Sequence, residues 1–139
     1  MLKHFIPILL FISSLGFSQN SVLTVSVSGL KNSTGKLTAE LYNSKGKFLK
    51  TAFKTVSSAI KSNSASVIFT DITKGEYTIM VYHDENNNGK LDKNFIGMPK
   101  EPVACSNNAK GFMGPPKYED AKFTITADSK ISIKMNDAL

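Results

Sequence analysis

Residues 77–92 read YTIMVYHDENNNGKLD and contain the two patterns that decide the fold. The first seven residues alternate along the chain, so Tyr77, Ile79, Val81 and His83 share one face of an extended segment. This pattern predicts a β-strand with a row of side chains facing the core. The residues that follow are rich in Asp, Asn and Gly, which end strands and shape turns. The stretch therefore predicts a β scaffold that carries a polar loop.

The same alternation recurs before and after this strand. Leu23, Val25 and Val27 fall on one face of residues 21–30, with small hydroxyl residues opposite. Strands are expected over residues 21–30, 36–43, 66–70, 77–82, 121–127 and 130–135. Residues 47–61 keep no clean period, so a short irregular strand and a packed loop both remain open there.

Turn residues between these segments predict how the strands are connected. Residues 31–35 are typical of a hairpin between the first two strands, and Asp128-Ser129 of a tight hairpin between the last two. Six or seven short strands without a helical period predict an all-β fold. The expected architecture is a small antiparallel β-sandwich of about seven strands with one long ordered loop.

Tyr77 follows a turn that ends in Gly75, a pattern common before strands of small sandwiches. One interpretation is a tyrosine at the corner of the sandwich, with its hydroxyl bonded to nearby backbone. The other is an edge aromatic with no special contact.

Residues 84–120 show no convincing regular element and hold four of the five prolines. A loop of this length in a small domain is functional, disordered or wrongly assigned. Its apolar residues favour an ordered loop that is anchored on the sandwich. These residues are Phe95, Ile96, Met98, Phe112, Met113 and Tyr118.

The first eighteen residues resemble an export signal. A short basic start precedes the apolar run 5–15, and small residues stand at Gly16 and Ser18. We expect a signal peptide over 1–18, cleavage before Gln19, and a single β-sandwich domain over 19–139. A retained membrane anchor is the alternative, although the apolar run is short for a span. Nothing after residue 18 is apolar enough to cross a membrane, so the mature chain is expected to be periplasmic, exposed on the cell surface or secreted.

The charge pattern limits the classes of partner. The formal net charge is +6, and all seventeen basic residues are lysines. Arginine dominates bidentate recognition of phosphate and guanine, and no basic cluster with interleaved aromatics is present. Nucleic-acid binding is therefore not expected. An envelope protein or a glycan is the expected partner.

Cys105 is the only cysteine of the chain. An exported domain with one cysteine has no internal disulfide, so packing or a metal must hold it together. A buried, inert thiol is the expected state, because free cysteines are among the most buried residues.

The polar loop has oxygen-bearing side chains at alternate positions, followed by a glycine. This spacing agrees with the first nine positions of a calcium loop of the EF-hand type. The predicted ligands are Asp84, Asn86, Asn88, the carbonyl group of Lys90, and Asp92. Phe95 stands where the bidentate glutamate is needed, so the expected affinity for Ca²⁺ is low, in the millimolar range. The alternative is an Asn/Gly-rich turn held by its own side chains.

His83 is the only histidine after the predicted signal peptide. A structural histidine bonded to loop backbone is one interpretation. The other is a hydrolase in which His83 works with Asp84 or Glu101 as acid and base. No serine stands in a Gly-x-Ser-x-Gly context, and one His with one Cys is a poor ligand set for a transition metal.

Several motifs together resemble the DUF2141 family of exported bacterial proteins of unknown function, over roughly residues 23–135. The residues that carry the resemblance are His83, Asp84, Asn86, Asn88, Gly89, Leu91, Asp92, Asn94, Gly97, Pro99, Glu101, Ser106, Asn107, Asn108, Gly114, Pro115, Tyr118, Glu119, Asp120, Ala121 and Phe123. The resemblance implies a transthyretin-like or carboxypeptidase-regulatory-like β-sandwich and no established activity. Residues 103–105 depart from the family, whose members often carry an aromatic and glycine segment there.

These patterns favour an exported, non-enzymatic β-sandwich module whose polar loop presents a binding surface. The competing hypothesis is the hydrolase. A third is a structural domain that acts through its strand edges, which exposed lysines disfavour.

Overall fold

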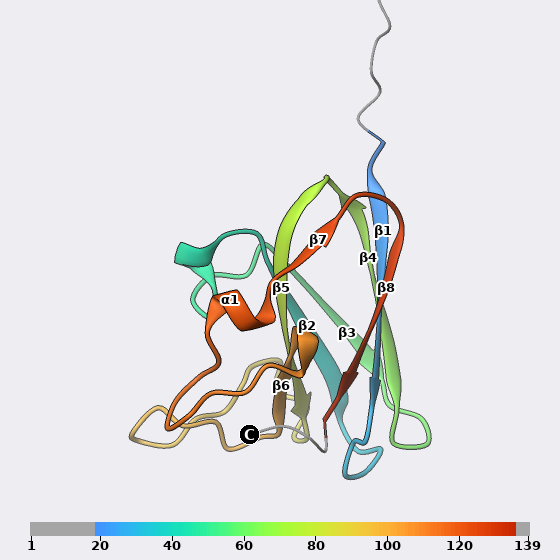
Figure 1. Ribbon diagram of the computed structural model, residues 1–139. Coiled ribbons are helices and arrows are strands. Elements are labelled where there is room, and N and C mark those ends of the chain that lie inside the picture. The colour runs from blue at the N-terminus through green and yellow to red at the C-terminus, as the bar shows by residue number, and fades with distance from the viewer. Residues whose placement is uncertain (1–18, 136–139) are drawn as a thin grey trace, which may run out of the picture.

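The computed structural model describes residues 19–135 (Figure 1). The predicted signal peptide, residues 1–18, lies outside the described residues. Within 19–135, no helix has both the length and the apolar character needed to cross a membrane.

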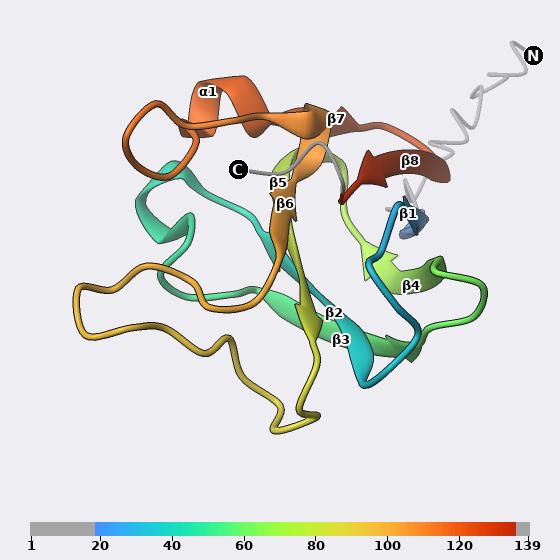
Figure 2. The same ribbon diagram turned by 90° about the horizontal axis from the view of Figure 1, so that it is seen from below.

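Eight strands form two facing sheets (Figures 1 and 2). The strands are β1 Ser21–Ser28, β2 Lys36–Tyr42, β3 Lys54–Ala59, β4 Ala65–Ile72, β5 Gly75–Asp84, β6 Val103–Cys105, β7 Phe123–Ile125 and β8 Ser129–Lys134. Three short helical turns lie between them: η1 Lys45–Lys47, η2 Ser106–Asn108 and α1 Tyr118–Ala121. The predicted all-β, sandwich-like fold is confirmed.

One sheet has the order β4-β1-β8, and the other has the order β3-β2-β5-β6 with β7 also paired to β5. All neighbouring strands are antiparallel except β1 and β8, which run parallel. The prediction of a purely antiparallel sandwich was therefore wrong for this pair. The first and last strands of the chain lie side by side and close the smaller sheet.

The core between the sheets follows from the alternation. Leu23, Val25 and Val27 of β1 are buried against the predicted row of β5, in which Tyr77, Ile79 and Val81 are also buried. Burying such side chains supplies the main driving force for folding, at about 25 cal/mol for each Å² of apolar surface.

The hairpin predicted between the first two strands was wrong. β1 and β2 belong to different sheets, and residues 31–35 pass from one sheet to the other. Gly35 has φ +68°, and a Cβ atom there would lie 2.0 Å from the Asp84 carbonyl oxygen. The glycine therefore permits a close approach to the end of β5 and not a tight hairpin turn.

The hairpin predicted between the last two strands was also wrong, for the same reason. β7 pairs with the start of β5, whereas β8 pairs with β1 in the opposite sheet. Asp128 in the link accepts a hydrogen bond from the Val22 backbone N–H over 2.8 Å. The link therefore crosses between the sheets and is fastened to the start of β1.

The region left open, residues 47–61, contains an edge strand. β3 pairs with β2, and Phe48 before it packs with Tyr42 and Tyr118 in a second, smaller apolar cluster. This cluster lies on the face of the larger sheet that points away from the core, because Tyr42 follows buried Leu41 on a strand whose side chains alternate.

Tyr77 occupies the corner of the sandwich, as one of the two interpretations predicted. Its hydroxyl donates to the Thr73 carbonyl oxygen over 2.8 Å and lies 3.1 Å from the Thr73 hydroxyl. Cys105 is buried and free, as expected. Burial raises the pKa of its thiol to about 12, which keeps it protonated and inert.

Candidate functional site

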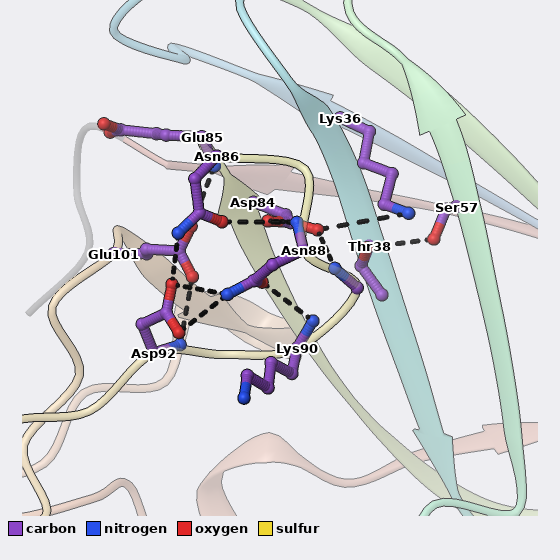
Figure 3. A network of polar contacts seen from close by, with 11 residues as sticks. Lys36, Thr38, Ser57, Asp84, Glu85, Asn86, Asn88, Lys90, Asp92 and Glu101 are labelled. Carbon is purple, nitrogen blue, oxygen red and sulfur yellow. Dashed lines mark hydrogen bonds and ion pairs between the residues drawn. The ribbon is translucent and has the colours of Figure 1, made fainter.

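The polar loop, residues 84–102, leaves the end of β5 and returns to β6 (Figure 3). Asp84 is fully buried at its start. The Asp84 carboxylate accepts the backbone N–H groups of Asn88 and Gly89, over 3.1 and 2.8 Å. Lys36 Nζ lies 4.0 Å from the same carboxylate. Asp84 therefore curls the first half of the loop back onto the strand, and Gly89, with φ +80°, permits the turn.

Glu101 holds the two ends of the polar loop together. Its side chain is 8% exposed. One carboxylate oxygen accepts the Glu85 backbone N–H over 2.8 Å, and the other accepts the Asp92 backbone N–H over 3.0 Å. Hydrogen bonds from N–H groups to a carboxylate are about twice as strong as those between neutral groups. The two buried carboxylates, Asp84 and Glu101, are seventeen positions apart in the sequence, and together they order the loop.

Asp92 gathers the two asparagine side chains. Asn86 Nδ2 donates to Asp92 over 2.7 Å, and Asn88 Nδ2 donates over 2.8 and 3.0 Å. These donors, Asn88 first and Asn86 second, hold the pKa of the Asp92 carboxyl below its usual value. Asn88 Oδ1 also accepts the backbone N–H of Lys90 over 3.1 Å, so the side chains staple the loop to itself.

The predicted calcium ligands are brought together only in part. Asp92 contacts Asn86 and Asn88 directly, whereas Asp84 reaches them through the backbone of Asn88. Both asparagines turn an N–H donor, and not an oxygen, toward Asp92. Lys90 is exposed, and its side chain points away from the network in Figure 3. Among residues 19–135 there is no group of three or more His, Cys, Asp or Glu side chains that could hold a metal ion.

The three residues of the hydrolase hypothesis make separate contacts in the described part of the chain. His83 is fully buried, its Nε2 lies 2.6 Å from the Thr34 carbonyl oxygen, and its Nδ1 has no hydrogen-bond partner. His83 and Asp84 are consecutive on β5, so their side chains point to opposite faces of the sheet. The two carboxylates are engaged by backbone N–H groups of the polar loop. The histidine contacts the backbone of the link between β1 and β2, through the Thr34 carbonyl oxygen.

Residues missed by the sequence analysis complete the loop. Asn94 Oδ1 accepts the backbone N–H groups of Ile96 and Met98, over 3.1 and 2.9 Å. The Asn94 backbone N–H bonds the Met98 carbonyl oxygen, and Gly97 has φ +83°. The Asn-x-x-Gly pattern of residues 94–97 was the available signal, since Asn side chains cap turns and Gly takes positive φ.

The expectation that the apolar residues of the long loop anchor it on the sandwich was wrong for five of the six. Tyr118 is buried, in the cluster with Tyr42 and Phe48. The exposed residues are Phe95, Ile96, Met98, Phe112 and Met113.

In the comparison with protein families, residues 25–134 match the model described as an uncharacterized protein conserved in bacteria (DUF2141). The chain belongs to the DUF2141 family. Neither the comparison with curated proteins nor the comparison with solved structures found a match.

The Ser-Asn-Asn motif of this DUF2141 chain ties three elements together. The buried Ser106 hydroxyl accepts the Ile79 backbone N–H over 3.0 Å and donates to the Ala121 carbonyl oxygen. Asn107 Nδ2 donates to the carbonyl oxygens of Asp120 and Lys122, over 3.1 and 2.8 Å. Asn108 Oδ1 accepts the backbone N–H of Lys134 in β8 over 3.0 Å. The motif therefore fastens α1 and β8 to the larger sheet.

Proposed function

We propose that this DUF2141 protein is an exported, non-catalytic binding module. Its polar loop is preorganised to engage a component of the cell envelope, a protein or a glycan. One observation carries the proposal: Asp84 and Glu101 accept four backbone N–H groups of the loop between them. A loop that is fixed before binding loses less conformational entropy when a partner arrives.

The same carboxylates support a non-catalytic function. A general acid or base must reach the proton that it transfers, within about 3 Å or through one water. The carboxylate oxygens of Asp84 and Glu101 accept hydrogen bonds from the loop backbone. His83 faces the core from the other side of β5. This arrangement favours a structural use of all three residues.

The test replaces Glu101 by Gln and compares it with Glu85→Gln. Gln at 101 keeps one acceptor, so either the Glu85 or the Asp92 backbone N–H loses its partner. We expect a loss of about 1.5–3 kcal/mol, the range for hydrogen bonds to charged groups. Hydrogen exchange should quicken at the Glu85 and Asp92 amides.

Glu85→Gln is the matched control, because this glutamate is exposed and its side chain points away from the network (Figure 3). It should leave exchange and stability within about 0.5 kcal/mol of the parent. Equal exchange in the two variants would refute the preorganised loop.

We propose in addition that the polar loop takes Ca²⁺ weakly. The gathering of Asn86, Asn88 and Asp92 beside Gly89 supports this proposal. An ion there requires both amides to turn an oxygen toward Asp92, which gives up the bond from Lys90 N–H to Asn88 Oδ1. That exchange of contacts is consistent with low affinity.

Thermal melting in EDTA and in CaCl₂ at about 10 mM, roughly ten times a millimolar Kd, tests whether the ion binds. A ligand that binds only the folded state at ten times its Kd raises stability by about 1.4 kcal/mol. Asp92→Asn should abolish the shift, and Glu85→Gln should keep it. An unchanged melting midpoint would refute the calcium proposal and would not affect the proposal that the protein is a binding module.

Export is tested separately by sequencing the N-terminus of the protein recovered from the periplasm or the medium. A chain that begins at Gln19 fits the signal peptide over 1–18. A cytoplasmic, unprocessed chain would contradict it.

A further inference from the structure

The polar loop ends in a tight turn with an apolar surface. We call residues 94–98 the first tip. Four of its backbone N–H groups, those of residues 94, 96, 97 and 98, are hydrogen-bonded within the turn. Phe95 is 99% exposed, Ile96 64% and Met98 59%. The turn is therefore ordered by its own hydrogen bonds, and it exposes three large apolar side chains to water.

A second tight turn repeats this arrangement. We call residues 111–115 the second tip. A Cβ atom at Gly111 would lie 1.8 Å from the Gly114 carbonyl oxygen, so the turn is closed tightly on itself. Phe112 is 93% exposed and Met113 94%. Exposed apolar groups of this size on ordered turns mark an interaction surface.

The two tips project from the same side of the molecule. In both Figure 1 and Figure 2 they extend away from the β4-β1-β8 sheet, on the side of the larger sheet. One flat partner can therefore meet both tips at once.

The charges around the tips select the partner. Lys93 and Lys100 flank the first tip, and Lys110 and Lys117 flank the second; all four are exposed. Glu101 is the single acidic residue of residues 93–117, and it is buried and bonded to backbone N–H groups. Each tip thus presents exposed apolar side chains that are flanked in sequence by two lysines.

We infer that the two tips dock on an anionic phospholipid surface. The apolar side chains enter the headgroup region, and the lysines contact the anionic headgroups. Interfacial binding needs this combination of buried apolar area and basic charge, because neither alone gives a stable attachment. A lipid surface accepts separate tips without shaped pockets, whereas a protein partner needs a matched pocket for each. The inference rests on the proposed function in one respect: the ordered polar loop carries the first tip.

The test measures flotation of the protein with vesicles of phosphatidylcholine, with and without phosphatidylglycerol. The protein is the processed form from an exporting host. We expect binding to the anionic vesicles that weakens as salt screens the lysines. The variant Phe95→Ser/Phe112→Ser should bind at least about tenfold more weakly, because burial of each ring contributes to transfer from water. The variant Lys93→Gln/Lys100→Gln should lose about tenfold on anionic vesicles only.

Matched controls come from the opposite sheet. Ile68→Ser removes an exposed apolar side chain of β4, and Lys130→Gln/Lys134→Gln removes two exposed lysines of β8. Both should bind like the parent. All replaced side chains are exposed, so circular dichroism and the unfolding midpoint should not change.

Absence of vesicle binding by the parent overturns the inference. Equal binding of the tip variants and the β-sheet controls overturns it as well. Loss of self-association in the tip variants, without vesicle binding, would assign the surface to a second copy of the chain. The proposed function is tested separately, by hydrogen exchange in Glu101→Gln. The proposed function and the lipid-docking inference can therefore be refuted independently.

Discussion

The polar loop and the helical segment, which we define as residues 106–121, each carry one of the two tips and contain little regular structure. They are ordered by different forces. The polar loop has no buried apolar anchor of its own between residues 85 and 100 and depends on carboxylates that accept backbone N–H groups. The helical segment is held by Tyr118 and Ala121, which pack in the cluster with Tyr42 and Phe48.

The difference shows that one scaffold can present two similar tips whose supporting segments respond differently to acid and to mutation. An ordering that depends on hydrogen bonds to carboxylates responds to the exchange of Asp for Asn, and to acid at Asp92, whose pKa is lowered. An ordering that depends on burial responds to lost side-chain volume and is indifferent to acid. The two segments should therefore fail under different conditions.

The largest expected effect is in the helical segment. Tyr118→Ala removes an aromatic ring that meets Phe48 edge to face, with centroids 5.9 Å apart. We expect a loss of about 3 kcal/mol, the lower end for a buried aromatic. Urea unfolding at pH 7 measures it.

Tyr118→Phe is the control for this change. It loses only the hydroxyl bond to Glu76, which is 2.7 Å long, and should cost about 1 kcal/mol. Burial raises the pKa of Tyr118 to about 12, so the phenol is neutral throughout the experiment. Equal losses in the two variants would mean that the hydroxyl, and not the packing, holds the segment.

An intermediate effect is expected from Asp84→Asn in the polar loop. Asn offers one acceptor oxygen. Either the Gly89 N–H loses its partner, or the Asn88 N–H keeps only its longer bond of 3.3 Å to Asn86 Oδ1. We expect a cost of about 1.5–3 kcal/mol. Amide exchange should rise in residues 85–92 and stay unchanged at Ala121. Asp120→Asn makes the same chemical change in the helical segment, where the side chain is exposed. It should alter amide exchange neither in residues 85–92 nor at Ala121. Faster exchange at Ala121 in Asp84→Asn would show that the two segments are coupled.

The smallest effect is expected from acid. The pKa of Asp92 is lower in the folded protein than its ordinary 3.8, because Asn88 and Asn86 donate to the ionised carboxylate. A lowered pKa stabilises the fold above the ordinary value, and this stabilisation disappears as pH falls through the folded pKa. Protection factors at Asn88 and Lys90 should drop below about pH 4.

The burial of Ala121 should keep that amide protected over the same range. The surface ion pairs of Glu119 with Lys122 and Lys45 also weaken in acid, but pairs of this kind contribute little. Parallel loss of protection at Asn88 and Ala121 would remove the contrast between the segments.

The sequence predicted the faces of the strands well and their neighbours poorly. Alternation states which side chains share a face, so the row Tyr77, Ile79, Val81 was predicted and is buried. It does not state which strand lies alongside. Residues 31–35 have the composition of a hairpin turn, yet they cross between sheets, because Gly35 serves the contact with Asp84.

The sequence analysis selected residues 84–92 as the candidate site, but the hydrogen bonds within it were not predicted. The Asx-rich spacing identified residues 84–92 as an ordered polar loop. The second carboxylate, Glu101, is supplied by a residue sixteen positions beyond Glu85, a separation that no local pattern encodes. The apolar tips were misread, since composition does not reveal whether a Phe in a loop faces the sheet or the solvent.

The parallel pairing of β1 and β8 determines at which end of the sandwich each terminus of the domain can be attached to a support. Strand β1 begins at one end of the sandwich, and the polar loop lies at the other end (Figure 1). Strand β8 runs with β1 and so finishes at the loop end, where the Met135 backbone N–H bonds the Ser28 carbonyl oxygen. Immobilising the protein on a solid support through the chain before residue 19 therefore leaves the two tips accessible. A tag attached after β8 would lie close to the tips.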